Sequence, residues 1–155
     1  MQFFCDVMLG RLAKYLRMLG IDTLYSRSIS EASLIKTAAN QNRTILTRRT
    51  KFLRIKNPPP FFFIKNNNPE IQLKEVINHF NINVDRLKPF RLCLLCNRAL
   101  KDVDRNLVEG KVPEYIFNQK NRFSQCPNCH RIYWQGTHYK NMSEGIPGFF
   151  NVENQ

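Results

Sequence analysis

Four of the five cysteines in this 155-residue chain form two pairs, Cys93 with Cys96 and Cys126 with Cys129. Two intervening residues let both thiolates of one tight turn point at the same metal ion, and two such turns complete a tetrahedral shell. The spacing therefore predicts one structural zinc ion (Zn) bound by these four side chains. The fifth cysteine, Cys5, stands in an apolar run, and we expect it to be buried and unreactive.

A run of basic residues could neutralise the phosphates of a nucleic acid. Six cations and no acid occupy residues 43–56, namely Arg43, Arg48, Arg49, Lys51, Arg54 and Lys56. With a formal net charge of +12, this run predicts binding to a polyanion, with RNA as the leading partner. Two alternatives stay open: the run is the solvated face of a short helix, or the charge serves solubility alone.

Carboxylates that could hold a divalent ion are few in the first 88 residues. A metal-dependent nuclease needs several of them around magnesium or manganese (Mg or Mn) to activate water. Asp6 ends an apolar run and Glu31 follows Ser30 at an expected helix start, so these two are the candidate catalytic residues. Structural roles stay open for both: Asp6 could cap the next helix, and Glu31 could favour a helix N-terminus.

Neither histidine near the second cysteine pair is an expected zinc ligand, because four sulfurs already fill the shell. We expect His130 at the surface or supporting the ligands, and His138 packed among aromatic residues or in contact with RNA. The neighbouring aromatic residues could stack on bases or form a small core of their own. They are Phe117, Phe123, Tyr133, Trp134 and Tyr139.

Strands alternate with helices up to about residue 85. After an apolar run at residues 3–5, apolar residues at helical spacing predict a helix over residues 9–19, ended by Gly20. Further elements follow in the order strand 21–25, helix after Ser30, strand 44–46, strand 61–64 and helix after Asn68. This order predicts an α/β fold with a mostly parallel sheet, whose ligands bind at the carboxyl ends of the strands. Asp6 and residues 47–49 would share that edge.

The helical and strand periodicities end near the first cysteine pair, and turn residues take over. We therefore predict an α/β domain over residues 1–88 and a small zinc-binding domain over residues 89–155. No apolar run is long enough to span a membrane and the first residues do not resemble a secretory leader, so a cytoplasmic location is expected.

Several motifs together resemble the mut-seven C-terminal ribonuclease domain family. They are DVMLGRLAKYLRMLG at 6–20, IDTLY at 21–25, LTR at 46–48 and CPNCHRIYWQGTH at 126–138. The resemblance implies a PIN-like α/β ribonuclease domain followed by a zinc ribbon, with RNA as substrate. It also implies that Asp6 matches the first catalytic acid of the family and that Glu31 falls close to the second acidic cluster.

The sequence departs from this family at Arg49, where the resemblance leads one to expect aspartate after Thr47 and Arg48. Exchanging a carboxylate for a guanidinium removes a metal ligand and adds a repelling cation. Three functions therefore stay open. The chain is a metal-dependent ribonuclease, a weakened or inactive RNA-binding module, or a module that docks on a larger ribonucleoprotein partner.

Overall fold

The computed structural model describes residues 1–135, and the chain divides into two compact units, residues 1–97 and 98–155. Residues 89–97, with the first cysteine pair, group with the first unit. The predicted domain boundary after residue 88 stays a prediction. No helix within residues 1–135 is long and apolar enough to cross a membrane.

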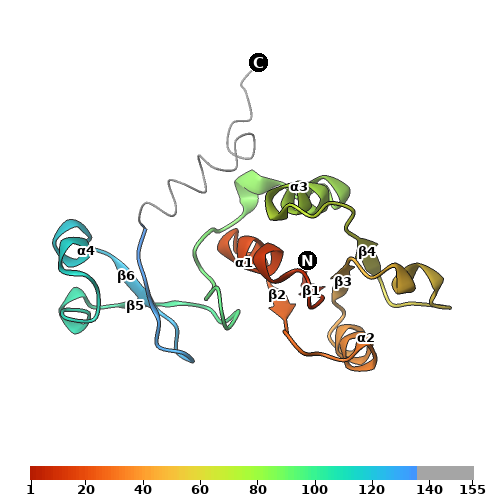
Figure 1. Ribbon diagram of the computed structural model, residues 1–155. Helices are drawn as coiled ribbons and strands as arrows, with labels where there is room; N and C mark the ends of the chain where they lie inside the picture. The colour runs from red at the N-terminus through yellow and green to blue at the C-terminus, as the bar shows by residue number, and fades with distance from the viewer. Residues whose placement is uncertain (136–155) are drawn as a thin grey trace, which may run out of the picture. The chain divides into compact units, whose positions relative to one another are not determined.

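The first unit is built on a four-stranded parallel sheet with the strand order β2-β1-β3-β4 (Figure 1). Its strands are β1 (Phe3–Cys5), β2 (Thr23–Tyr25), β3 (Thr44–Thr47) and β4 (Phe61–Phe63). The central strand β1 is buried along its whole length and pairs with both β2 and β3. A strand with both faces buried reads as a continuous apolar run, which is why these residues do not alternate with polar ones.

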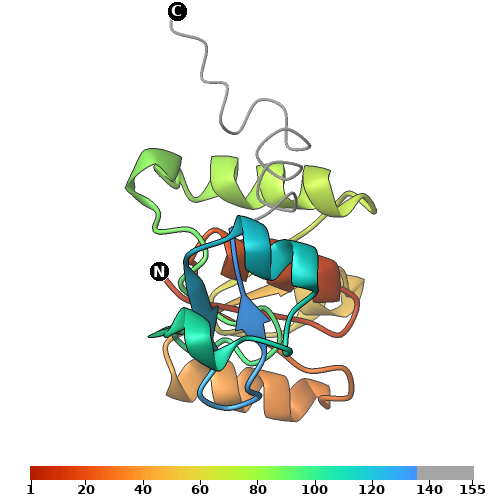
Figure 2. The same ribbon diagram turned by 90° about the vertical axis from the view of Figure 1, so that its left-hand side faces the viewer.

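Helices cover both faces of this sheet. Helix α1 (Gly10–Met18) packs against α3 (Pro69–His79) on one face, and α2 (Glu31–Asn40) lies on the other (Figures 1 and 2). The short 3-10 helix η1 (Thr50–Arg54) joins the α2 side through Phe52, which is fully buried against α2 and the sheet. A second 3-10 turn, η2 (Val84–Arg86), follows α3.

The helix boundaries follow the polar residues that the sequence places there. The Ser30 side chain accepts a hydrogen bond from the Ser33 amide at the start of α2, and Asn68 caps α3 ahead of Pro69. Gly20 ends α1 with a φ of +82°, and a Cβ added there would lie 2.2 Å from the carbonyl oxygen of Lys88. Glycine is therefore required both by the backbone conformation and by the close approach of a later segment.

The second unit is a small antiparallel sheet with one short helix. Its strands are β5 (Lys101–Val103), β6 (Phe123–Gln125) and β7 (Ile132–Tyr133), in that order, and η3 (Arg105–Leu107) and α4 (Glu114–Gln119) connect the first two. These connecting turns and β6 share a core of Val108, Val112, Ile116 and Phe123. The predicted class, a mostly parallel α/β sheet followed by a small ribbon, is confirmed.

Candidate functional site

Asp6 stands at the carboxyl end of β1, and its side chain is completely buried. Its Oδ1 accepts a hydrogen bond from the amide of Val7 at 2.7 Å, and its Oδ2 accepts one from the Thr47 hydroxyl at 2.8 Å. Helix α1 begins after Leu9 with no side-chain cap, so Asp6 is not the cap of that helix. The carboxylate instead faces the end of β3.

Arg49 provides the opposite charge. Its Nη2 lies 2.8 Å from Oδ1 of Asp6, and its backbone amide donates to the Thr47 hydroxyl at 3.0 Å. Thr47 thus connects Asp6 and Arg49, because its hydroxyl donates to the Asp6 carboxylate and accepts from the Arg49 backbone amide. A buried carboxylate is costly unless it is paired and hydrogen-bonded, and Asp6 meets both conditions without a metal ion.

Glu31 makes a second pair with the same basic segment. Its Oε1 lies 3.1 Å from Nζ of Lys51, and the Lys51 side chain is 71% exposed. Both candidate catalytic acids are therefore bound to cations that follow β3. An exposed pair of this kind contributes little to stability, typically below about 1 kcal/mol, whereas the Asp6 pair lies at a buried carboxylate.

Two further residues of the predicted basic run, Arg43 and Arg48, are held by partners other than Asp6 and Glu31. Arg43 precedes β3 at the opposite end of the sheet, where it is buried and its Nη1 lies 2.7 Å from Oδ1 of Asp22. Arg48 binds the carbonyl oxygens of Lys65 and Asn66. Its guanidinium therefore orders the loop after β4.

Arg54 and Lys56 are exposed and lie beyond the end of β3, in η1 and the loop that leads back to β4. Neither makes an ion pair within the part of the chain that the structure describes. Phe52 anchors this segment, and cutting a buried phenylalanine to alanine typically costs about 3–5 kcal/mol. The 3-10 helix η1 is thus amphipathic, because Phe52 is buried whereas Lys51 and Arg54 are exposed.

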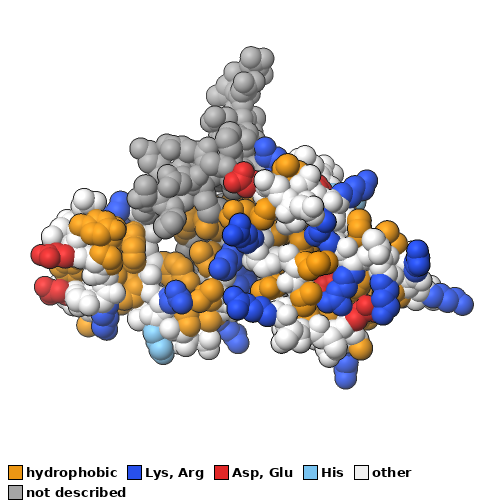
Figure 3. Space-filling model, in the orientation of Figure 1, with side chains coloured by type: hydrophobic (Ala, Val, Ile, Leu, Met, Phe, Trp, Pro, Cys, Tyr) orange, Lys and Arg blue, Asp and Glu red, His pale blue; other side chains and the backbone are white. Residues whose placement is uncertain are grey.

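Three further cations, which no pattern in the sequence singles out, follow the ends of the other strands. Arg27 follows β2, Arg11 lies in the first turn of α1 after β1, and Lys65 lies just beyond β4; all three are exposed. Lone cations carry no motif, and only the strand order shows that they share an edge. On the face in Figure 3, Lys and Arg side chains outnumber acidic ones over the first unit.

The charge of the chain is unevenly divided. Residues 1–97 contain sixteen Lys and Arg against six Asp and Glu, a net of +10. Residues 98–155 contain eight against six, a net of +2. Attraction to a polyanion is therefore concentrated in the α/β unit.

The four predicted zinc ligands come together. The sulfur atoms of Cys93, Cys96, Cys126 and Cys129 all lie within 4.8 Å of one another. The amides of Cys96 and Cys129 approach the sulfurs of Cys93 and Cys126 at 3.4 and 3.5 Å, as expected of the tight turns. Four thiolates in this arrangement fit a closed tetrahedral zinc site.

No other group of three or more acidic, histidine or cysteine side chains in residues 1–135 brings its ligand atoms this close. His130 is exposed and outside the sulfur cluster, whereas His138 and Tyr139 lie outside the described residues. Cys5 is fully buried, and burial raises the pKa of its thiol above the ordinary value, so it stays protonated and inert.

Comparison with protein-family models supports the family resemblance of the sequence. The model of the Mut7-C RNase domain matches residues 1–146. The chain belongs to the Mut7-C RNase domain family. No curated protein and no solved structure matches it. Within this Mut7-C chain, the residues around Asp6 do not fit a divalent ion in the conformation observed, because Arg49 occupies the charge-neutralising position beside the carboxylate.

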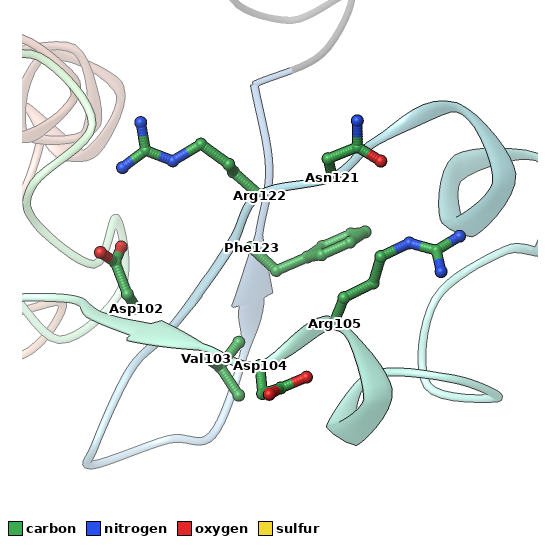
Figure 4. A pocket seen from close by; sticks show the side chains of 7 residues that line it. All are labelled: Asp102, Val103, Asp104, Arg105, Asn121, Arg122 and Phe123. Carbon is green, nitrogen blue, oxygen red and sulfur yellow. The ribbon is translucent and has the colours of Figure 1, made fainter.

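Three aromatic residues of the second unit, Phe117, Phe123 and Trp134, contribute to its core. Phe123 is buried, the Trp134 ring lies 6.5 Å from it, and Phe117 packs against the same cluster. A surface hollow of about 330 Å³ runs beside Phe123, lined by acidic and basic side chains in similar number (Figure 4). Arg105 on its wall is already bound to the Phe117 carbonyl at 2.7 Å and stacked on the Phe117 ring, so its guanidinium is engaged within the unit.

Proposed function

We propose that this Mut7-C chain binds RNA along the carboxyl edge of its parallel sheet and does not cleave it. The observation that carries the proposal is the ion pair between the buried carboxylate of Asp6 and the guanidinium of Arg49, 2.8 Å apart. In this proposal the Arg49 guanidinium takes the place beside Asp6 that a catalytic metal ion of a ribonuclease would need. Membership of an RNase domain family makes RNA the polyanion of choice.

A divalent ion could reach Asp6 only after Arg49 had moved away. Magnesium demands near-ideal octahedral oxygen ligands at about 2.0–2.1 Å, which a guanidinium 2.8 Å from the same oxygen excludes. Like charges at such distances repel strongly outside bulk water. Glu31 could supply a second oxygen only by leaving Lys51. The arrangement therefore supports binding over metal-activated hydrolysis.

The cations that would contact RNA follow the four strand ends in spatial order. Across the sheet they are Arg27 after β2, Arg11 after β1, Lys51 after β3 and Lys65 after β4. Neighbouring strands lie about 4.8 Å apart, so the row spans on the order of 15 Å. Such a row can contact more than one phosphate of a single strand and release the associated counterions.

One observation favours metal-dependent hydrolysis as a second candidate function. The Arg49 side chain is 26% exposed, so an RNA phosphate could compete with Asp6 for its guanidinium. The carboxylate would then be open to a metal ion. This candidate differs from the first in its requirement for manganese or magnesium and for Asp6.

Titration of fluorescein-labelled single-stranded RNA, followed by anisotropy at several salt concentrations, tests the binding site. The double substitution Arg27→Glu and Lys65→Glu should weaken binding at least tenfold and flatten the dependence on salt. The matched control is Lys101→Glu with Lys111→Glu, which changes the net charge equally in the second unit, where both lysines are exposed. A loss confined to the control would move RNA binding to the second unit and overturn the proposed edge.

A further inference from the structure

The first cysteine pair rests on a buried arginine of the α/β unit. Arg17, in the last turn of α1, is only 4% exposed, and its Nη1 donates to the carbonyl oxygens of Leu94 and Leu95 at 2.6 and 3.1 Å. These two residues separate the cysteines of the pair. The Nε of the same arginine donates to the carbonyl of Thr23 at 2.8 Å. One guanidinium thus joins α1, β2 and the metal-binding turn.

Asn97 closes the turn from its other end. Its backbone has a φ of +57°, and its amide donates to the carbonyl of Cys93 at 2.9 Å. Its side-chain oxygen accepts from the Thr23 amide at 3.0 Å, and its Nδ2 donates to Oδ1 of Asp22 at 2.6 Å. The residue directly after the second cysteine is therefore bound to the first residue of β2.

Asp22 connects this turn to the sheet. Its carboxylate accepts from Asn97 and from Arg43, which also donates to the carbonyl of Phe3 in β1. Partial burial alone would raise the pKa of Asp22, but hydrogen bonds from Arg43 and Asn97 outweigh it and lower the pKa below its ordinary value. The charged form of Asp22 is thus the form that the folded unit stabilises.

A CxxC turn binds zinc through its own geometry and needs none of these contacts. Their presence, with Arg17 buried and Asp22 and Asn97 partly buried, indicates that the α/β unit helps to hold the turn in place. Groups that orient metal ligands typically change metal affinity by about 10–100-fold when they are removed. The free energy gained by binding a structural metal ion also stabilises the folded segments that carry its ligands.

We propose that Arg17, Asp22 and Asn97 are positioning residues of the metal site, and that they couple metal binding to the folding of α1 and β2. Loss of the metal then loosens the α/β unit, beyond the ribbon that follows it. This coupling is independent of RNA binding, because it involves only the cysteine cluster and the contacts among Phe3, residues 17–23, Arg43 and residues 93–97.

Zinc affinity, measured by competition with a chromophoric chelator, tests the positioning role. Asn97→Gly keeps a residue that tolerates positive φ and removes both side-chain hydrogen bonds, and we expect about a tenfold loss of affinity. The matched control is Asn81→Gly, since Asn81 also has a positive φ, of +48°, and is exposed. Equal affinities of the two variants would overturn the proposal.

Hydrogen exchange of the wild-type chain tests the coupling without any substitution. When zinc is removed with a chelator, the amides of residues 16–25 should lose protection at least tenfold, including the Thr23 amide that donates to Asn97. Amides of α2, which makes none of these contacts, should change less. Unaltered exchange in residues 16–25 on metal removal would contradict the coupling.

Discussion

Replacing Arg49 with methionine leaves the buried Asp6 carboxylate with no cation. Removing one partner of a fully buried pair costs about 3–5 kcal/mol. Arg49 is partly exposed and Asp6 keeps its hydrogen bonds from Val7 and Thr47, so the loss should approach that of one hydrogen bond to a charged group, about 1.5–3 kcal/mol. We expect about 2 kcal/mol, which for a unit of this size corresponds to a fall in Tm of about 10 °C.

Thermal and urea unfolding followed by far-UV circular dichroism measures this loss, because α1, α2 and α3 all lie in the first unit. Lys51→Met is the matched control: it removes the exposed pair with Glu31 and should cost less than about 1 kcal/mol. Adding Asp6→Asn to Arg49→Met removes the unpaired charge and should recover part of the loss, since the two residues interact directly. An Arg49→Met chain as stable as wild type, or strictly additive effects, would refute the ion pair.

Three other measurements test the cysteine site, Asp22 and Arg49. Metal analysis should find one zinc per chain, whereas a metal-free protein with Cys93 and Cys96 in a disulfide would contradict the site. Wild type should be more stable than Asp22→Asn at pH 7, and this advantage should shrink below about pH 4, because the folded-state pKa of Asp22 is lowered. Urea unfolding at pH 7 and pH 3 measures the difference in free energy of unfolding. An advantage that grew on acidification would contradict the lowered pKa. Arg49→Asp should gain manganese-dependent RNA cleavage that vanishes when Asp6→Asn is added, and a gain that survives Asp6→Asn would exclude a shared ion.

The sheet and its helices could be predicted because local signals agree with the tertiary structure. The apolar run at residues 3–5 is the buried central strand, and Ser30 and Asn68 cap helices as their side chains suggest. The four-cysteine cluster was predictable for a similar reason, since ligand spacing within each turn fixes half of the site. Gly20 was recognised as a helix end, but its close approach to Lys88 depends on a segment far along the chain.

The cations of the proposed RNA-binding edge were harder to predict, because a run of charges in the sequence does not show which end of the sheet each side chain reaches. Arg43 and Arg49 belong to one run in the sequence, yet they lie at opposite ends of β3 and bind different acids. Conversely, Arg27 and Lys65 follow the two outer strands of one parallel sheet, and only the strand order shows this. The roles of Asp6 and Glu31 in catalysis, RNA binding and the cytoplasmic location stay predictions.

Incubation of the wild-type chain with labelled single-stranded RNA, in manganese and in excess EDTA, tests most directly whether the Asp6–Arg49 pair closes the site to a metal ion. Affinity and cleavage are measured on the same samples. Zinc-loaded protein should be used, with brief exposure to EDTA, so that the four-cysteine site stays filled. We expect equal affinity in both conditions and intact RNA in both. Cleavage that requires manganese and disappears in Asp6→Asn would show that Arg49 yields its place to a metal ion, and would contradict the proposal that the ion pair closes the site.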